Sequence, residues 1–347
     1  MNVRQVVQLA NEWVELYGKQ MQGFCGAYLT GGINFLPSHA PFPPYCDVDL
    51  IVVLQQGGKS SQENLELAYK GLILECGFKG LAEYDSPANV LANPHLAPNL
   101  AVNSVLSDPT GLLTRTHQAV AQEYTRRQWV VARCNYEKKR ALGHLAQWSE
   151  ADSPFEVLTQ LWWVANFLAG SIAVASLKPP THRRALVLMQ ELLQAQGQLD
   201  QHEEMLSVLG FGHMSLETVE FYLQECAVAF DRAVAVKRTP FPWDVKLHAH
   251  IRPYAIEGSR EMIDAGYHRE AMFAIELFLV LSIIAIQNDA PEEDKPPFQA
   301  LFGRFLGDLG VTTPADWRSR LERAKKLAEE IFRVADEIVE SNAEIAD

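Results

Sequence analysis

Cysteine is scarce in this chain and is not arranged for cross-linking or for zinc. The 347 residues include five cysteines, an odd number, and no two of them form a C-x-x-C pair. This usage argues against a disulfide framework and against a zinc site, and it fits a reducing compartment. We therefore expect a cytoplasmic protein, for which the 48% of apolar residues is ample to build hydrophobic cores.

Positive charge is also in short supply. The chain has 30 basic and 43 acidic residues, which gives a formal net charge of −13. Nucleic-acid binders normally present a basic face, so we expect no nucleic-acid partner. The densest positive segment includes Arg126, Arg133 and Arg140 and reads more readily as a solvated helix face than as a phosphate-binding surface. An acidic protein suits a cationic small substrate.

Signals for secretion and for membrane insertion are missing as well. The first 21 residues have the apolar spacing of an amphipathic helix and do not resemble a signal peptide. The most apolar later stretch, Ala271–Ile286, is shorter than the roughly 20 residues of a membrane span and is interrupted by Glu276. We predict a buried helix there and no membrane partner. The chain also lacks an internal repeat and the Walker A, G-x-S-x-G and H-E-x-x-H motifs.

What the sequence does contain is one informative stretch, Tyr28–Leu54. A strand-like run ends at Thr30-Gly31-Gly32, and after a proline-bearing loop the β-branched residues of 46–54 predict a buried strand. Asp47 and Asp49 project from the same face of that strand, because side chains alternate with period two. Two neighbouring carboxylates repel unless a cation joins them, and such oxygen ligands suit Mg²⁺. The paired glycines leave room for phosphates to approach the backbone.

This order of strand, Gly-Gly, loop and Asp-x-Asp strand resembles the signature of the DNA-polymerase-β-like nucleotidyltransferase superfamily. It is most similar to the kanamycin-nucleotidyltransferase-like small-molecule branch, and it covers about the first third of the chain. The resemblance implies that Thr30, Gly31 and Gly32 bind the nucleotide and that Asp47 and Asp49 are catalytic and bind two Mg²⁺ ions. The loop over 33–46 departs from the family, because it is longer than usual and rich in proline.

The same resemblance implies a third acid on a strand that follows a helix. We predict a helix over Ser61–Cys76, stopped by Gly77, and then a strand over Phe78–Tyr84. Glu83 is our choice for the third catalytic acid, with Asp85 second.

The next predicted strand, Asn99–Ser107, offers an alternative for this position. If the third acid belonged there, Asn103 would occupy its place, and a neutral amide would weaken metal binding. The protein would then bind nucleotides without turning them over.

Beyond about residue 113 the patterns are helical, and we place the domain boundary at 115. Residues 1–115 would form a nucleotidyltransferase-like domain and 116–347 a helical bundle centred on Phe155–Ser176, which is apolar nearly all round. A helix restarting at Thr181 would place Arg183 at an anion-binding N-terminus, where it could contact the nucleotide. The apolar face of the last helix, Ala315–Asn342, can dock in cis, which we favour, or form a homodimer.

Together these patterns predict an α+β protein with a small mixed sheet followed by an all-α bundle. The predicted activity is a metal-dependent nucleotidyltransferase that moves a nucleoside monophosphate, AMP from ATP, to a hydroxyl of a small and cationic acceptor. One alternative is a nucleotidyltransferase-like nucleotide-binding or regulatory protein with a degenerate site. Another is a helical interaction protein in which the sheet is only structural.

Overall fold

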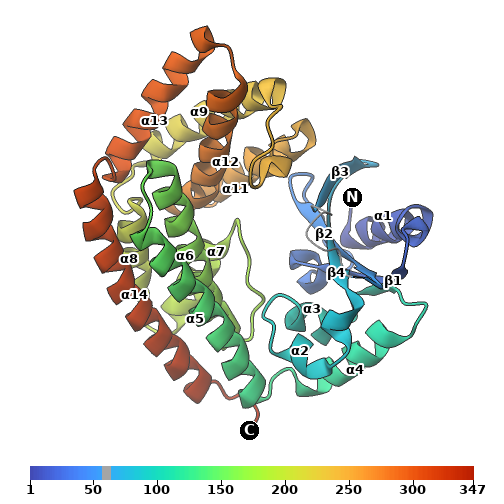
Figure 1. The fold of residues 1–347 in the computed structure, drawn as a ribbon. Coiled ribbons are helices and arrows are strands. Elements are labelled where there is room, and N and C mark those ends of the chain that lie inside the picture. The colour runs from blue at the N-terminus through green and yellow to red at the C-terminus, as the bar shows by residue number, and fades with distance from the viewer. Residues whose placement is uncertain (57–63) are drawn as a thin grey trace. The chain divides into compact units, whose positions relative to one another are not determined.

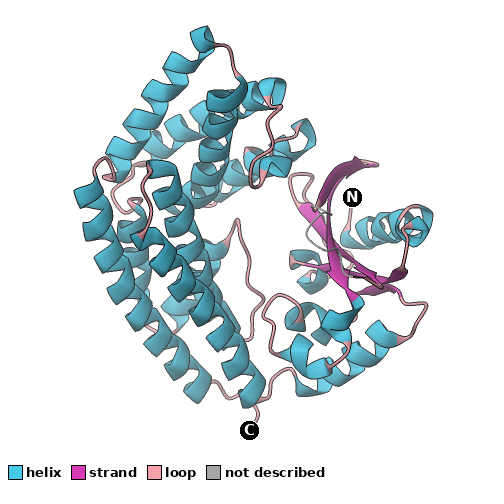
Figure 2. Cartoon of the chain, viewed as in Figure 1, coloured by secondary structure: helices cyan, strands magenta, loops and turns pink. Residues whose placement is uncertain are grey.

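The computed structural model describes residues 1–56 and 64–347, and the chain divides into two compact units. Every strand among these residues belongs to the first unit, and the second is helical (Figure 2). The predicted α+β class with a mixed sheet is therefore confirmed. The first unit comprises Met1–Tyr136, Leu177–Thr181 and Asn342–Asp347, and the second comprises Glu137–Ser176 and His182–Ser341.

The sheet has five strands in the order β3-β4-β2-β1-β5 (Figure 1). β2 and β4 are parallel, whereas the other neighbouring pairs are antiparallel. The strands predicted on either side of the diglycine are confirmed as β1 and β2, which fits their richness in β-branched and aromatic residues. The strand bounds are β1 Phe24–Thr30, β2 Asp47–Leu54, β3 Leu65–Tyr69, β4 Leu72–Gly80 and β5 Val105–Ser107.

The helix predicted over Ser61–Cys76 is wrong for the residues that the structure describes. Residues 61–63 lie outside them, and from Leu65 onward the stretch forms the β3–β4 hairpin. Lys70 and Gly71 join the two strands with φ values of 47° and 83°. Two positive φ values are what a two-residue type I′ turn needs, and the twist of that turn matches a hairpin. Gly77, predicted to stop the helix, lies within β4.

Helices cover both faces of the sheet. The side chains of each strand alternate between the two faces, so apolar residues on either face need a helix to cover them. The face that carries Val48 and Leu50 packs on α1, whose Asn2 cap confirms the predicted N-terminal helix. The face that carries Tyr28 and Val53 packs on the next three helices, α2, α3 and α4. The bounds of the four helices are α1 Val3–Leu16, α2 Pro87–Leu91, α3 Ala97–Ala101 and α4 Leu112–Glu123.

Two further predicted strands are shorter than expected. The strand over Phe78–Tyr84 is wrong beyond Gly80, because residues 81–84 form a 3₁₀ turn. The strand over Asn99–Ser107 is confirmed only from Val105. Pro98 explains the difference, because proline in the first turn favours a helix start, and α3 occupies 97–101.

The second unit surrounds two long apolar helices, α6 and α12. Both are long and apolar enough to cross a membrane, but 83% of the most apolar window of each is buried inside the protein. The buried helix predicted at Ala271–Ile286 is thus confirmed. The helix bounds are α5 Arg127–Ser149, which continues from the first unit, α6 Pro154–Ala175, α7 Ala185–Ala195, α8 Leu199–Leu209, α9 Leu216–Val236, α10 Arg252–Ala255, α11 Glu257–Asp264, α12 His268–Asp289, α13 Lys295–Leu309 and α14 Pro314–Ser341.

The last helix, α14, packs on α6 and α8 of its own unit. Its apolar face is buried through residues such as Leu327, Ile331 and Ile338. The predicted docking in cis is therefore confirmed. The predicted domain boundary at residue 115 falls inside α4, which belongs to the first unit.

Candidate metal centre

Three carboxylates meet where β2 and β4 lie side by side in the first unit. The parallel register sets Asp49 of β2 directly beside Glu75 of β4, and Asp47 lies two residues earlier on the same face of β2. One oxygen atom from each of these three residues lies within 4.8 Å of the others. All three side chains are half-buried, so the cluster is partly shielded from water yet reachable. Clustered carboxylate oxygens are the donor set that Mg²⁺ prefers.

The cluster is part of a row of side chains that crosses four strands. Glu66 of β3 pairs with Glu75, and Thr30 of β1 pairs with Asp49. Glu66 is 9% exposed, so this row concentrates negative charge in a region of low dielectric. These carboxylates also act on the neighbouring thiol of Cys76. Burial and the negative charges of Glu66, Glu75 and Asp49 raise its pKa. Like charges directly opposite each other destabilise a sheet, and a bound cation would offset this cost.

The diglycine bend lies against the carboxylate cluster. Gly31 has φ 75° and ψ −165°, a conformation open essentially only to glycine. A Cβ atom at this position would lie 2.1 Å from Asp49 Oδ2, far inside any allowed contact. Around Gly32, in contrast, a Cβ atom would meet nothing within 4 Å, so there is open space beside it. Gly31 is therefore required for the carboxylate, and Gly32 leaves room for a ligand.

The buried residue Asn99 fixes the conformation of the diglycine bend through hydrogen bonds. The Gly31 N–H donates to Asn99 Oδ1 at 3.1 Å, and Asn34 Nδ2 donates to the same oxygen at 3.0 Å. Asn99 Nδ2 in turn donates to the carbonyl of His95 at 2.9 Å, and the Asn99 side chain is only 5% exposed. Asn99 thus holds the backbone that Asp49 packs against. The Gly31 N–H is used in this bond, so phosphate binding by this glycine would rest on the space around it rather than on its N–H group.

Comparison with known proteins adds no family to this geometry. No protein-family model matches the chain, and no curated protein matches it by sequence. The case for a function therefore depends on the residues themselves.

The third acid of the cluster is Glu75 and not Glu83. Glu83 lies in the 3₁₀ turn after β4, where it accepts a hydrogen bond from the Gly80 N–H at 3.3 Å and pairs with Lys79 at 3.4 Å. Asp85 follows as the C-cap residue of that turn. The β-strand β4 begins earlier than the sequence predicted, and this brings Glu75, and not Glu83, into register with Asp49.

Arg183 does not stand at a helix N-terminus as predicted. α7 begins at Ala185, and Arg184, not Thr181, is its N-cap residue. The Arg183 guanidinium donates to the Tyr254 carbonyl at 3.1 Å and lies 4.3 Å from the centroid of the Tyr254 ring. These contacts hold Arg183 within the second unit.

The positive segment around α5 is exposed at Arg126, Lys138 and Arg140, as a solvated helix face requires, but Arg133 departs from this pattern. Arg133 is 1% exposed and donates to the carbonyls of Leu91 at 2.9 Å and Tyr124 at 2.8 Å. Arg133 therefore connects α5 to Leu91 and Tyr124 within the first unit. Its buried charge could be foreseen only from these long-range partners, which no local pattern reveals.

Proposed function

We propose that this protein is a metal-dependent nucleotidyltransferase that moves AMP from ATP to a hydroxyl of a small acceptor. The observation that supports this best is the packing of Gly31 against Asp49, beside the cluster of Asp47, Asp49 and Glu75. A glycine bend with open space next to a set of hard oxygen ligands is what a nucleoside triphosphate with its Mg²⁺ ions requires. Glu75 takes the role that the sequence suggested for Glu83.

The residues of this chain would bind the metal ions, orient the substrates and accept a proton. Asp47, Asp49 and Glu75 would hold the Mg²⁺ ions, which when bound neutralise phosphate charge and polarise the reacting oxygens. The open space at Gly32 would admit the triphosphate. Glu75 would complete the metal ligands or accept the proton of the attacking hydroxyl. The net charge of −13 favours a cationic acceptor, since it attracts such molecules to the surface.

The cysteines support a proposal about the compartment. All five lie in the described part of the chain and are free thiols. Free thiols fit a reducing environment, so we propose a cytoplasmic location, where ATP and Mg²⁺ are both available.

The decisive experiment incubates the full-length protein with α-labelled ATP, Mg²⁺ and a panel of hydroxylated acceptors that includes aminoglycosides. We expect labelled AMP on an acceptor together with release of pyrophosphate. Asp49→Asn should reduce the rate about 100-fold or more, because a ligand to the charge-stabilising ion is lost. Asp85→Asn is the matched control, since it removes an aspartate of the same unit that lies outside the cluster, and it should leave the rate unchanged.

Two other outcomes would favour a different function. Metal-dependent ATP binding without pyrophosphate release, for every acceptor, would favour the regulatory alternative. If the wild-type protein binds no nucleotide at all, the nucleotidyltransferase proposal fails and a structural role for the sheet becomes the better account.

A further inference from the structure

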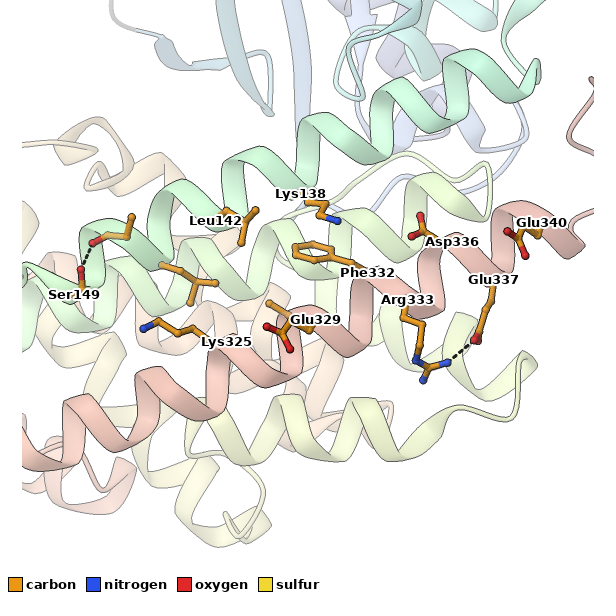
Figure 3. Close-up of a pocket in the computed structure, with 13 residues that line it drawn as sticks. Lys138, Leu142, Ser149, Lys325, Glu329, Phe332, Arg333, Asp336, Glu337 and Glu340 are labelled. Carbon is orange, nitrogen blue, oxygen red and sulfur yellow. Dashed lines mark hydrogen bonds and ion pairs between the residues drawn. The ribbon is translucent and has the colours of Figure 1, made fainter.

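A groove runs between α5 and α14 on the second unit. It encloses about 800 Å³, within the size range of small-molecule sites. Its floor is apolar and includes Leu145, Ala328 and Phe332, and Phe332 points from α14 toward α5 (Figure 3). Leu142 of α5 adds to this surface, and the residue is 48% exposed. None of these residues belongs to the carboxylate cluster of the first unit.

The edge of the groove along α14 carries uncompensated negative charge. Within the described part of the chain, no ion pair is formed by the lining residues Glu329, Asp336 or Glu340. The lining cations of α14 are already paired: Lys325 with Glu322 at 2.7 Å, and Arg333 with Glu337. Asp336 and Glu340 stand one helical turn apart, and like charges at that spacing destabilise a helix. A cation bound between the two carboxylates would offset this repulsion.

The groove already contacts one alkylammonium group. Lys138 of α5 places its Nζ atom 5.1 Å from the centroid of the Phe332 ring, which is a cation–π distance. The lysine side chain is an aliphatic chain ending in an ammonium ion. The groove thus combines two features that suit such groups: an aromatic and aliphatic floor for methylenes, and carboxylates for the charge.

We propose that this groove binds a linear aliphatic polyamine. The helical rise of about 1.5 Å per residue separates Asp336 from Glu340 by about 6 Å and from Glu329 by about 10 Å. Two amines joined by four carbons stand about 6 Å apart when extended, because five bonds of about 1.5 Å link them in a zigzag. The four-carbon arm of a triamine such as spermidine therefore spans Asp336 and Glu340, and its three-carbon arm carries the third ammonium about 5 Å further along the groove toward Glu329. Its methylenes cover the apolar floor. This site is independent of the proposed nucleotidyl transfer.

The test is calorimetric titration of the full-length protein at about 0.15 M salt with spermidine, 1,4-diaminobutane and butylamine. We expect affinity to fall in that order, because each probe carries one ammonium group fewer than the probe before it. The double variant Asp336→Asn/Glu340→Gln should weaken spermidine binding about tenfold or more. Glu330→Gln is the matched control: it removes one charge from the exposed side of the same helix without touching the groove, and it should bind as the wild type does.

Two further variants locate the amine. Ala146→Trp fills the groove from an exposed position of α5 without changing charge, and it should also weaken spermidine binding. Asp49→Asn should bind spermidine normally. The proposal is overturned if Glu330→Gln loses as much affinity as the double variant, if butylamine binds as well as spermidine, or if Asp49→Asn abolishes binding.

Discussion

At the scale of single residues, the position of the Asp49 carboxylate depends on the missing side chain of Gly31. The backbone of Gly31 is in a region that other residues avoid, and its hydrogen atom faces Asp49 Oδ2 where a Cβ atom would come within 2.1 Å. Asn99 holds that backbone in place through the Gly31 N–H. The bend therefore cannot move aside to accommodate a larger residue without losing its hydrogen bond to Asn99.

Gly31→Ala should consequently displace the Asp49 carboxylate. We expect divalent-metal affinity, measured by Mn²⁺ titration, to fall about tenfold or more, and stability to drop by at least about 1–2 kcal/mol because of the unfavourable backbone conformation.

Gly32→Ala is the matched control for this substitution. The neighbouring glycine has no positive φ, and a Cβ atom would meet nothing there, so metal affinity should be retained. Equal metal affinity in the two variants would show that the close approach of Gly31 to Asp49 has no role in binding.

At the scale of elements, the sequence predicts strands well where one signal dominates. β1 and β2 are found because their β-branched and aromatic residues have no helical spacing, and the alternation of Asp47 and Asp49 with buried Val48 and Leu50 is local information. The β3–β4 hairpin is missed because its short apolar runs fit a helical spacing as well. Its turn signal, Lys70-Gly71, is a single dipeptide.

The parallel register between β2 and β4 decides which acid joins Asp47 and Asp49. Glu75→Gln should therefore lower Mg²⁺ or Mn²⁺ affinity about tenfold, whereas Glu83→Gln should leave it unchanged, because Glu83 contacts Gly80 and Lys79 instead. Both changes remove one charge from neighbouring parts of the same chain, so a general electrostatic effect would appear in both. A loss confined to Glu83→Gln would restore the original prediction from sequence.

At the scale of the whole molecule, the class of fold is readable from sequence but the long-range ties are not. The sheet followed by apolar helices is confirmed because composition and periodicity are local properties. Asn99 reaches Gly31 across 68 residues, and Arg133 reaches Leu91 across 42. Such partners depend on how elements pack, so asparagine and arginine in these positions look like ordinary polar residues until the packing is known.

Glu276 is a further consequence of packing that concerns the stability of the second unit. It lies on α12, is 1% exposed, and neither of its carboxylate oxygens has a hydrogen-bond partner among the described residues. Burial raises the pKa of Glu276 to about 8, although the nearby Arg320 guanidinium lowers it in part. That guanidinium already donates to the carbonyls of Val208 and Leu309. The folded protein therefore favours the protonated carboxyl.

A raised pKa in the folded state means that this group destabilises the protein as pH rises. Below the unfolded pKa of about 4.3 Glu276 does not reduce the free energy of unfolding. Between that pH and about pH 8 the free energy of unfolding falls progressively, by at most about 5 kcal/mol in total. Glu276→Gln keeps the shape but cannot ionise, so it should be more stable than the wild type above pH 8 and similar near pH 4. Urea unfolding across this range tests the difference, with the exposed Glu330→Gln as a control that should show no such trend. If the gain from Glu276→Gln is the same at every pH, Glu276 does not titrate in the folded core.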